Sequence, residues 1–499
     1  MPGDSAPTSG VPVGIGGRTD TGACAAPAVQ MFLRPDGDVR VCCLNERALG
    51  NIRDTRLLDL WNSDRRRAIT DALRAHDFSM GCTTCGHEVA SEGRPGSYPA
   101  SFDEWLPDGL NAPTPEWPAV LDINLSISCN LQCIQCNGEQ SSAIRIHRER
   151  RPALAVPYDD QFFDDLGEFL PHARLARFAG GEPFLGPEFF RVWELIADRA
   201  PDLECVVITN ATQWNDRVRD TLRRVRMGFV LSIDAATEST YESIRVGASF
   251  AEMRRNVQHF RDHARAAGTH CSINFCLMQQ NVREFPDLLL WAEDLGLHVD
   301  VSVVRDPPRC SIPYIPQTQI RDHYEALAAR DAAMRQSLRV NGATWATELE
   351  RLRTWATCPP EELASLRGIS EHMVLLFKCE GVGAHDDRAA VDALREFAPG
   401  GPIARLRVNR WQHIVEVTPE FEQMFRVAPA ELIDQPVQLL NELVQQRCGE
   451  YQDYRVVAES PDRADITYLV DGHPTMAILV AQRGPDGWAE HADILFAMR

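Results

Sequence analysis

The sequence predicts an α/β protein whose centre is a partial (β/α)6 barrel, preceded by a cysteine-containing unit and followed by a small α+β domain. Strand patterns alternate with helical patterns across residues 119–310, which is typical of a parallel sheet with helical crossovers. A segment rich in Pro and Gly, residues 101–118, is typical of a linker before that region. Several apolar strand patterns in residues 401–499 surround one helical pattern and therefore predict a separate α+β fold.

The composition limits the possible classes of protein. The chain has 499 residues, of which 44% are hydrophobic and 24% are charged, as expected for a globular protein of several domains. The net charge of −20 disfavours a nucleic-acid partner, because such binding depends on Lys and Arg. An apolar run long enough to span a membrane is missing, and residues 1–20 predict a disordered lead-in without signal-peptide features. We therefore expect a cytoplasmic protein without a membrane partner.

The N-terminal unit, residues 21–100, begins with two predicted strands. They are Val29–Leu33 and Val39–Cys42, separated by a turn at Pro35–Gly37, and a helical pattern follows over Leu57–Ala75. Fifteen cysteines in a chain without an export signal indicate metal ligation or catalysis more than disulfides.

The central region, residues 119–310, contains six predicted strands, and a mainly helical connection is expected over residues 311–400. The predicted strands are Leu121–Ser128, Leu175–Phe178, Glu204–Thr209, Phe229–Asp234, Cys271–Leu277 and Val299–Val304. The helices expected between them include Glu188–Arg199, Phe250–Ala267 and Glu284–Leu295.

Three cysteines follow directly after the first of these strands. Cys129, Cys133 and Cys136 are spaced closely enough for their thiolates to bind one [4Fe–4S] cubane. Three ligands would leave one iron open to another molecule. The alternative is that they are buried thiols that lie close together by chance.

The spacing CX3CX2C after a first strand resembles the signature of the radical S-adenosylmethionine (SAM) superfamily. Gly180, Gly181, Glu182 and Pro183 follow the second strand and resemble the GGEP motif of that family. The resemblance implies that the open iron chelates the amino and carboxylate groups of SAM, and that the GGEP segment meets the amino group. Glycine permits such a close backbone approach, and a carboxylate suits an ammonium partner.

Polar residues at later strand ends are further candidates. Ser232 and Arg245 resemble residues that bind the SAM carboxylate in related enzymes, and Asn274 is a candidate for the ribose; the alternative for each is structural hydrogen bonding. Cys276 could return a hydrogen atom to a substrate radical, or could be a packing residue. Many family members carry an aromatic residue that packs on the adenine where this chain has Gln135.

A second group of cysteines lies in the N-terminal unit. Cys24, Cys42, Cys82 and Cys85 resemble the ligands of the SPASM auxiliary-cluster domain in its shortened form, called twitch. The resemblance implies one auxiliary [4Fe–4S] cluster and hence two clusters in all, although this domain follows the barrel in most relatives. A four-cysteine zinc site is the alternative. We expect Cys43 to be a buried thiol without a ligand role.

The last region, residues 401–499, resembles a PAS domain. Such domains bind small ligands or mediate dimers, but no residue indicates haem or flavin, and a structural or docking role is the alternative.

The resemblances imply an oxidoreductase or epimerase that cleaves SAM reductively and removes hydrogen from an unactivated carbon of a natural product. The substrate would be a peptide or a sugar-containing metabolite, and epimerisation, oxidation and crosslinking all stay open. A flavodoxin- or ferredoxin-type protein would supply the electron. The alternative is an iron–sulfur and PAS redox sensor that does not cleave SAM.

Overall fold

A computed structural model gives the fold of the chain. It describes residues 23–359 except 46, 83, 87–88, 90–93, 95–96, 107–108, 112–113 and 306, and then residues 363, 391, 394–399, 401–409, 414–428, 432, 452–460, 463–470, 473–483 and 489–498. The predicted lead-in at residues 1–20 lies outside the described residues. The chain groups into two compact units, one comprising residues up to 302 with 332–345, the other 303–331 with 346 onward.

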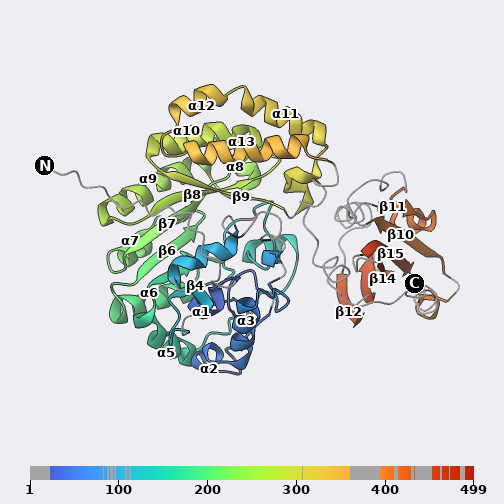
Figure 1. The fold of residues 1–499 in the computed structure, drawn as a ribbon, viewed down its shortest axis with the longest axis horizontal. Helices are drawn as coiled ribbons and strands as arrows, with labels where there is room; N and C mark the ends of the chain where they lie inside the picture. Colours follow the sequence, from blue (N-terminus) through green and yellow to red (C-terminus); the bar gives the residue numbers. More distant parts are fainter. Residues whose placement is uncertain are drawn as a thin grey trace. The chain divides into compact units, whose positions relative to one another are not determined.

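One nine-stranded sheet runs through the first unit (Figure 1). Its order is β3-β2-β1-β4-β5-β6-β7-β8-β9, and the neighbours from β4 to β8 pair in parallel. The α/β class and the mostly parallel sheet are as predicted, and the sheet is open. The strands are β1 (Gln30–Leu33), β2 (Asp38–Arg40), β3 (Gly50–Asn51), β4 (Val120–Ile123), β5 (Leu175–Phe178), β6 (Glu204–Thr209), β7 (Met227–Ser232), β8 (Cys271–Leu277) and β9 (His298–Val303).

Amphipathic helices separate the parallel strands. Helix α9 shows how the sequence sets their bounds: the Ser249 side chain accepts a hydrogen bond from the Glu252 amide, and the helix ends at Gly268, whose φ is +63°. Phe260 on its buried face packs against Phe229 of β7, with ring centroids 4.9 Å apart. The helices up to β9 are α1 (Ala26–Val29), α2 (Leu57–Trp61), α3 (Asp64–Arg74), α5 (Asp160–Phe169), α6 (Pro187–Arg199), α7 (Asp216–Leu222), α8 (Glu238–Ile244), α9 (Phe250–Ala267) and α10 (Phe285–Leu295).

The cysteine-containing unit joins the same sheet. Strand β1 pairs in parallel with β4, with Gln30 opposite Val120. On one face, the Gln30 side chain donates to Asp122 at 2.7 Å, and Arg177 of β5 donates to Gln30 at 3.0 Å. The sequence did not predict this pairing across a linker.

The first barrel strand is shorter than predicted. Strand β4 ends at Ile123, whereas the apolar alternation predicted a strand to Ser128. Beyond Ile123 the GGEP segment provides the hydrogen bonds, because the Gly181 amide donates to the Ser126 carbonyl at 3.0 Å and the Glu182 amide to the Ser128 carbonyl at 2.7 Å. Ser126 and Ser128 therefore pair with the loop after β5 and not with a neighbouring strand in a regular sheet.

Beyond β9 the chain becomes helical and then forms an antiparallel sheet of order β11-β10-β15-β14-β13-β12. Phe421 and Phe425 of its helix pack against Phe496, with ring centroids 5.4 and 5.1 Å away. The sheet and helix match the predicted α+β composition, although most of residues 419–446 lie outside the described part. The elements are α11 (Gln317–Ala328), α12 (Asp331–Ser337), α13 (Gly342–Thr357), β10 (Ile403–Asn409), β11 (Ile414–Val417), α17 (Glu420–Phe425), β12 (Gln452–Ser460), β13 (Arg463–Val470), β14 (His473–Arg483) and β15 (Ala489–Met498).

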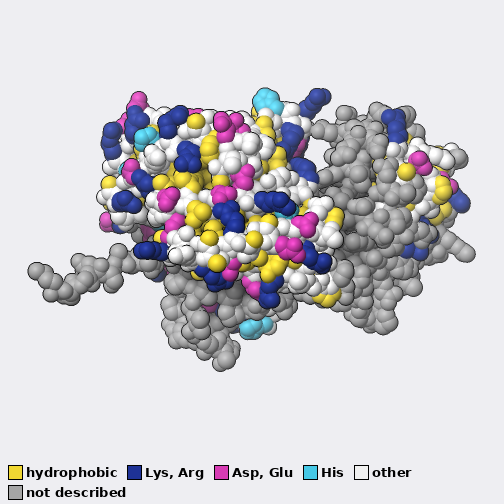
Figure 2. All heavy atoms as spheres, turned by 90° about the horizontal axis from the view of Figure 1, so that it is seen from above, with side chains coloured by type: hydrophobic (Ala, Val, Ile, Leu, Met, Phe, Trp, Pro, Cys, Tyr) yellow, Lys and Arg dark blue, Asp and Glu magenta, His cyan; other side chains and the backbone are white. Residues whose placement is uncertain are grey.

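The described surface carries both signs of charge. On the face drawn in Figure 2, basic and acidic side chains are interspersed, with apolar side chains between them. Among the described residues, each helix is too short or too polar to cross a bilayer.

Candidate functional site

The three cysteines of the predicted cluster motif lie in one loop after β4. The loop is fixed against the end of α8, because the Gln132 amide donates to the Val246 carbonyl and the Ile134 amide donates to the Ile244 carbonyl, each at 2.9 Å. The Cys136 amide donates to the Cys133 carbonyl at 3.1 Å. All three side chains are half-buried and lie close enough for their charges to interact.

The electrostatics of this loop suit a metal cluster. Burial raises the pKa of Cys133 to about 12 and that of Cys136 to about 11. A buried thiol therefore keeps its proton unless a cation replaces it, and iron ions bind the thiolate form. Three sulfur donors in one loop fit three irons of a [4Fe–4S] cluster.

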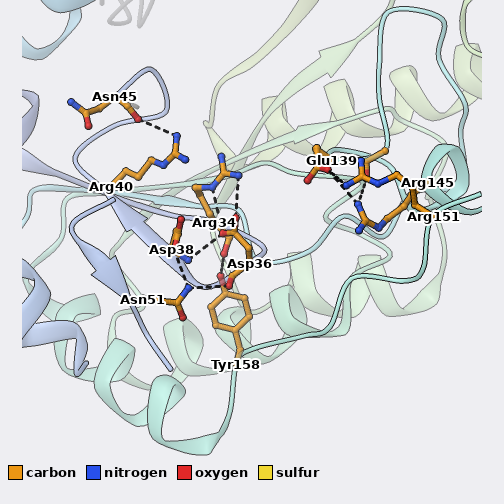
Figure 3. Close-up of polar contacts among 11 residues, drawn as sticks. Arg34, Asp36, Asp38, Arg40, Asn45, Asn51, Glu139, Arg145, Arg151 and Tyr158 are labelled. Atoms are coloured by element: carbon orange, nitrogen blue, oxygen red, sulfur yellow. Dashed lines mark hydrogen bonds and ion pairs between the residues drawn. The ribbon is translucent and has the colours of Figure 1, made fainter. Parts of the chain in front are cut away.

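An arginine that the sequence did not single out braces the loop. Arg148, in the π-helical turn η4 (Ile144–Arg148), donates to the Cys133 carbonyl at 3.3 Å and also contacts the Cys136 carbonyl. The segment after the loop is tied together by Glu139, which pairs with Arg145 at 3.4 Å and with Arg151 at 2.5 Å (Figure 3). The role of Arg148 could not be predicted from the sequence, because no residue spacing indicates that a side chain contacts backbone carbonyls.

The glycines of the GGEP segment are required by close packing. Gly180 has φ +125°, and a Cβ there would lie 2.2 Å from the Asn124 side-chain oxygen. A Cβ at Gly181 would lie 2.4 Å from the Ser128 carbonyl oxygen. Because the two glycines lack side chains, this segment can lie against the residues that lead from β4 into the cysteine loop. Pro183, which follows in the same motif, is buried.

The carboxylate of Glu182 is fully buried and accepts hydrogen bonds from the protein. Its oxygens accept from the Thr209 hydroxyl at 2.8 Å and from the Asn210 amide at 2.7 Å. Burial raises the pKa of Glu182 to about 7, although these donors oppose the rise. Asn210 in turn places its side-chain nitrogen 3.9 Å from the Cys129 sulfur. Glu182 therefore joins the ends of β5 and β6 to the cysteine loop.

Asp234, just after β7, connects three parts of the site. Its buried carboxylate lies 2.7 Å from the Arg245 guanidinium and accepts from the Gln135 side chain at 2.8 Å and the Cys276 amide at 2.9 Å. Among the described residues, Gln135 Oε1, Arg245 Nε and the Tyr241 hydroxyl are buried without a hydrogen-bond partner. Orphaned donors and acceptors beside the cysteines fit a polar ligand such as SAM, which offers both.

The other predicted residues lie on adjacent strands. Ser232 of β7 is opposite Asn274 of β8 in the sheet register. The Asn274 oxygen accepts from the Ser302 hydroxyl at 2.8 Å, and its nitrogen lies 3.8 Å from the Cys276 sulfur. Burial raises the pKa of Cys276, and Asp234 raises it further. The structure thus brings Ser232, Asn274 and Cys276 to the same region as Asp234.

The four cysteines of the N-terminal unit line one cavity. Cys24, Cys42, Cys82 and Cys85 are all buried there, together with Asn45. The Asn45 side chain donates to the Cys82 sulfur at 3.1 Å. Burial raises the pKa of Cys24 to about 12, so these sulfurs too would bind a cation in place of protons. Four sulfur donors that line one cavity are the donor set of a fully ligated [4Fe–4S] cluster or of a zinc ion.

The expected burial of Cys43 was wrong. Its side chain is exposed, and its sulfur lies 3.2 Å from the Tyr98 hydroxyl. Because Cys42 points into the buried cavity, the next residue in the turn faces outward.

Comparisons with known proteins agree with both cysteine groups. A family model described as the radical SAM superfamily matches residues 123–292, and the SPASM model, described as an iron–sulfur cluster-binding domain, matches residues 24–86. The GTP 3',8-cyclase of Sulfurimonas denitrificans is 23% identical over 186 residues, covering 36% of this chain and 53% of that protein. The AdoMet-dependent heme synthase of Methanosarcina barkeri is 24% identical over 183 residues, covering 36% and 48%. The chain spans about half the length of these curated relatives.

Solved structures give weaker similarities. SuiB of Streptococcus suis, determined with S-adenosylmethionine bound, is 15% identical and matches 44% of this chain and 48% of its own, with a TM-score of 0.33. A sensory box sensor histidine kinase of Vibrio cholerae is 13% identical and matches 23% of this chain and 92% of its own, with a TM-score of 0.14.

The two family matches imply iron–sulfur clusters and SAM as cofactors. Residues 24–86 match a SPASM domain and residues 123–292 match the radical SAM superfamily, so the chain carries a domain of each kind.

Proposed function

We propose that this protein is a radical SAM enzyme that modifies an unactivated carbon of a natural product. One observation carries the proposal: the cysteine loop, the GGEP segment and the buried Asp234 network meet at the same ends of neighbouring parallel strands. Ligand sites of open α/β sheets lie at such strand ends. With a [4Fe–4S] cluster and SAM bound, this site would supply a 5'-deoxyadenosyl radical that removes hydrogen from the substrate.

The residues of the chain would have separate roles. Cys129, Cys133 and Cys136 would hold the cluster, and Gly180, Gly181, Glu182 and Pro183 would shape the wall beside it. Arg245 and Ser232 would bind the SAM carboxylate, and Asn274 would lie near the ribose. Asp234 and Arg245 are themselves buried, and shielding from water is what a protein contributes to reactive intermediates.

The N-terminal cavity would hold a second [4Fe–4S] cluster on Cys24, Cys42, Cys82 and Cys85. Support comes from the cavity that these four residues share and from the match to an iron–sulfur cluster-binding family. A flavodoxin- or ferredoxin-type protein would provide electrons.

The substrate would be a peptide or a sugar-containing metabolite, and the outcome epimerisation, oxidation or crosslinking. Cys276 is our candidate hydrogen-atom donor for an epimerisation. Its half-buried sulfur lies beside Asn274, on the strand that follows β7 in the sheet.

The test is anaerobic incubation of the reconstituted protein with SAM and dithionite. We expect 5'-deoxyadenosine and methionine from the wild type and none from a Cys129/Cys133/Cys136→Ala variant. Intact clusters without any 5'-deoxyadenosine would instead support the redox-sensor alternative and refute the enzyme proposal.

A further inference from the structure

Gln135 lies inside the cysteine loop, and its side-chain amide has a fixed orientation. The Gln135 nitrogen donates to an Asp234 carboxylate oxygen at 2.8 Å. An ionised carboxylate only accepts hydrogen bonds, so rotating the amide to exchange its two ends would set two acceptors against each other. The Gln135 oxygen, Oε1, must therefore face away from Asp234.

The partner that fixes Gln135 is itself held firmly. Asp234 is fully buried and also binds the Arg245 guanidinium at 2.7 Å and the Cys276 amide at 2.9 Å. These contacts come from β8 and from the residue after α8, so the carboxylate has little freedom to follow a moving amide. Gln135 is consequently presented in one orientation.

The oxygen that faces away lacks a partner in the described part of the chain. Gln135 Oε1 is buried, and no donor of the described residues forms a hydrogen bond with it. An unsatisfied buried acceptor destabilises the folded state, so such an atom in a folded protein calls for an explanation. Among the described residues, the neighbouring Arg245 Nε is also buried without a hydrogen-bond partner, so this place has the chemistry of a site for a polar ligand.

We propose that Gln135 determines specificity for the nucleoside, with Oε1 accepting a hydrogen bond from a donor of the adenosyl group. The proposal rests on the proposed function, in which SAM binds beside the cysteine loop. There the SAM amino group is engaged at the iron and the GGEP segment. The donors left on the adenosyl group are the adenine amine and the ribose hydroxyls, and both have the chemistry that an orphaned acceptor requires.

This role differs from aromatic packing. An aromatic ring at position 135 would offer no amide nitrogen to Asp234 and no acceptor to the ligand. In this chain, recognition by a directed hydrogen bond takes the place of a stacking surface. Gln135 is therefore expected to discriminate between nucleosides that have the same shape but different donors.

The experiment is anaerobic equilibrium dialysis on the full-length protein with reconstituted clusters. The probes are S-adenosylhomocysteine, its inosine analogue, which lacks the adenine amine, and its 2'-deoxy and 3'-deoxy analogues. None of them requires SAM cleavage. The variants are Gln135→Leu and, as a matched control in the same loop, Gln132→Leu, because the hydrogen bond from Gln132 that fixes the loop is made by its backbone amide, which this substitution keeps.

In the wild type, we expect one analogue to bind about tenfold more weakly than S-adenosylhomocysteine, the loss of one hydrogen bond. Weaker binding of the inosine analogue would identify the adenine amine as the donor to Gln135. Weaker binding of a deoxy analogue would identify the ribose hydroxyl that this analogue lacks. Gln135→Leu should bind S-adenosylhomocysteine about tenfold more weakly and no longer distinguish that analogue, while Gln132→Leu should behave as the wild type.

If the wild type bound all four probes with equal affinity, this result alone would overturn the proposal. Discrimination that persists in Gln135→Leu would overturn it as well. Iron content and the visible spectrum of each protein report whether the clusters are intact. Production of 5'-deoxyadenosine by the wild type with dithionite separately tests the proposed function, so the two failures are distinguishable.

Discussion

The guanidinium of Arg245 lies 2.7 Å from the carboxylate of Asp234, and the two residues are 5% and 0% exposed. Burial lowers the pKa of Arg245, but the negative charge of Asp234 raises it above its ordinary value. The arginine therefore stays charged beside the cysteine loop. Because Gln135 binds the same carboxylate, this ion pair links the loop to β7 and β8.

Replacing Asp234 by Asn should destabilise the fold strongly. Arg245 would remain as a buried charge without its counterion, a change that costs about 3–5 kcal/mol. Chemical denaturation of the metal-free protein measures this loss. The matched control is Asp220→Asn, which breaks a pair with Arg223 in which the side chains are 68% and 71% exposed, and it should cost less than about 1 kcal/mol. If both substitutions lowered the free energy of unfolding equally, Asp234 would not be the counterion that stabilises the buried Arg245.

Gly181→Ala should disturb the wall beside the cysteine loop. The new methyl group would lie 2.4 Å from the Ser128 carbonyl oxygen, and backbone cannot yield as a flexible side chain does. We expect a loss of about 1–3 kcal/mol in the free energy of unfolding and weaker SAM binding in dialysis. Gly342→Ala, where a methyl group meets open space, should leave both unchanged. A Gly181→Ala protein with normal stability would show that the segment can shift freely.

Glu182 should make stability depend on pH. Burial raises its pKa from 4.5 to about 7 in the folded chain, so the folded chain binds this proton more tightly than the unfolded chain does. This contribution to stability is fully present below pH 4.5 and is lost as the pH rises through about 7. Glu182→Gln should flatten the unfolding free energy of the metal-free protein across that range. An unchanged slope would mean that Glu182 titrates normally.

The N-terminal cavity can be tested by iron content. The wild type should bind roughly eight irons per chain, and Cys82→Ala should bind roughly four, because two four-iron clusters are expected and one loses a ligand. Cys43→Ala is the control: its side chain is exposed beside the cavity ligand Cys42, so it should retain the full iron content. Stoichiometric zinc in place of half the iron would refute the auxiliary cluster.

Local patterns predicted most of the parallel sheet. The predicted bounds of Leu175–Phe178, Glu204–Thr209 and Cys271–Leu277 agree with β5, β6 and β8, because short apolar runs between helical patterns mark buried strands well. The end of the first strand was wrong, since the hydrogen bonds of Gly181 and Glu182 replace the ladder after Ile123. Such long-range contacts do not appear in a strand's own periodicity.

The same limit applies to the site. The spacing of Cys129, Cys133 and Cys136 is local and could be seen in the sequence. The bond from Gln135 to Asp234 spans 99 positions, and the pairing of β1 with β4 joins segments on both sides of a linker. Contacts of this kind depend on tertiary packing. Arg148 is one of many arginines in the sequence, and its contact to a loop carbonyl becomes visible in the structure.

The most direct test of the central claim is electron paramagnetic resonance on a Cys82/Cys85→Ala variant, which should retain only the cluster of the Cys129 loop. After reduction with dithionite, we predict the signal of one reduced [4Fe–4S] cluster, and addition of SAM should change that signal because SAM binds the open iron. A signal that SAM leaves unchanged, or the loss of all cluster signal in this variant, would contradict the account.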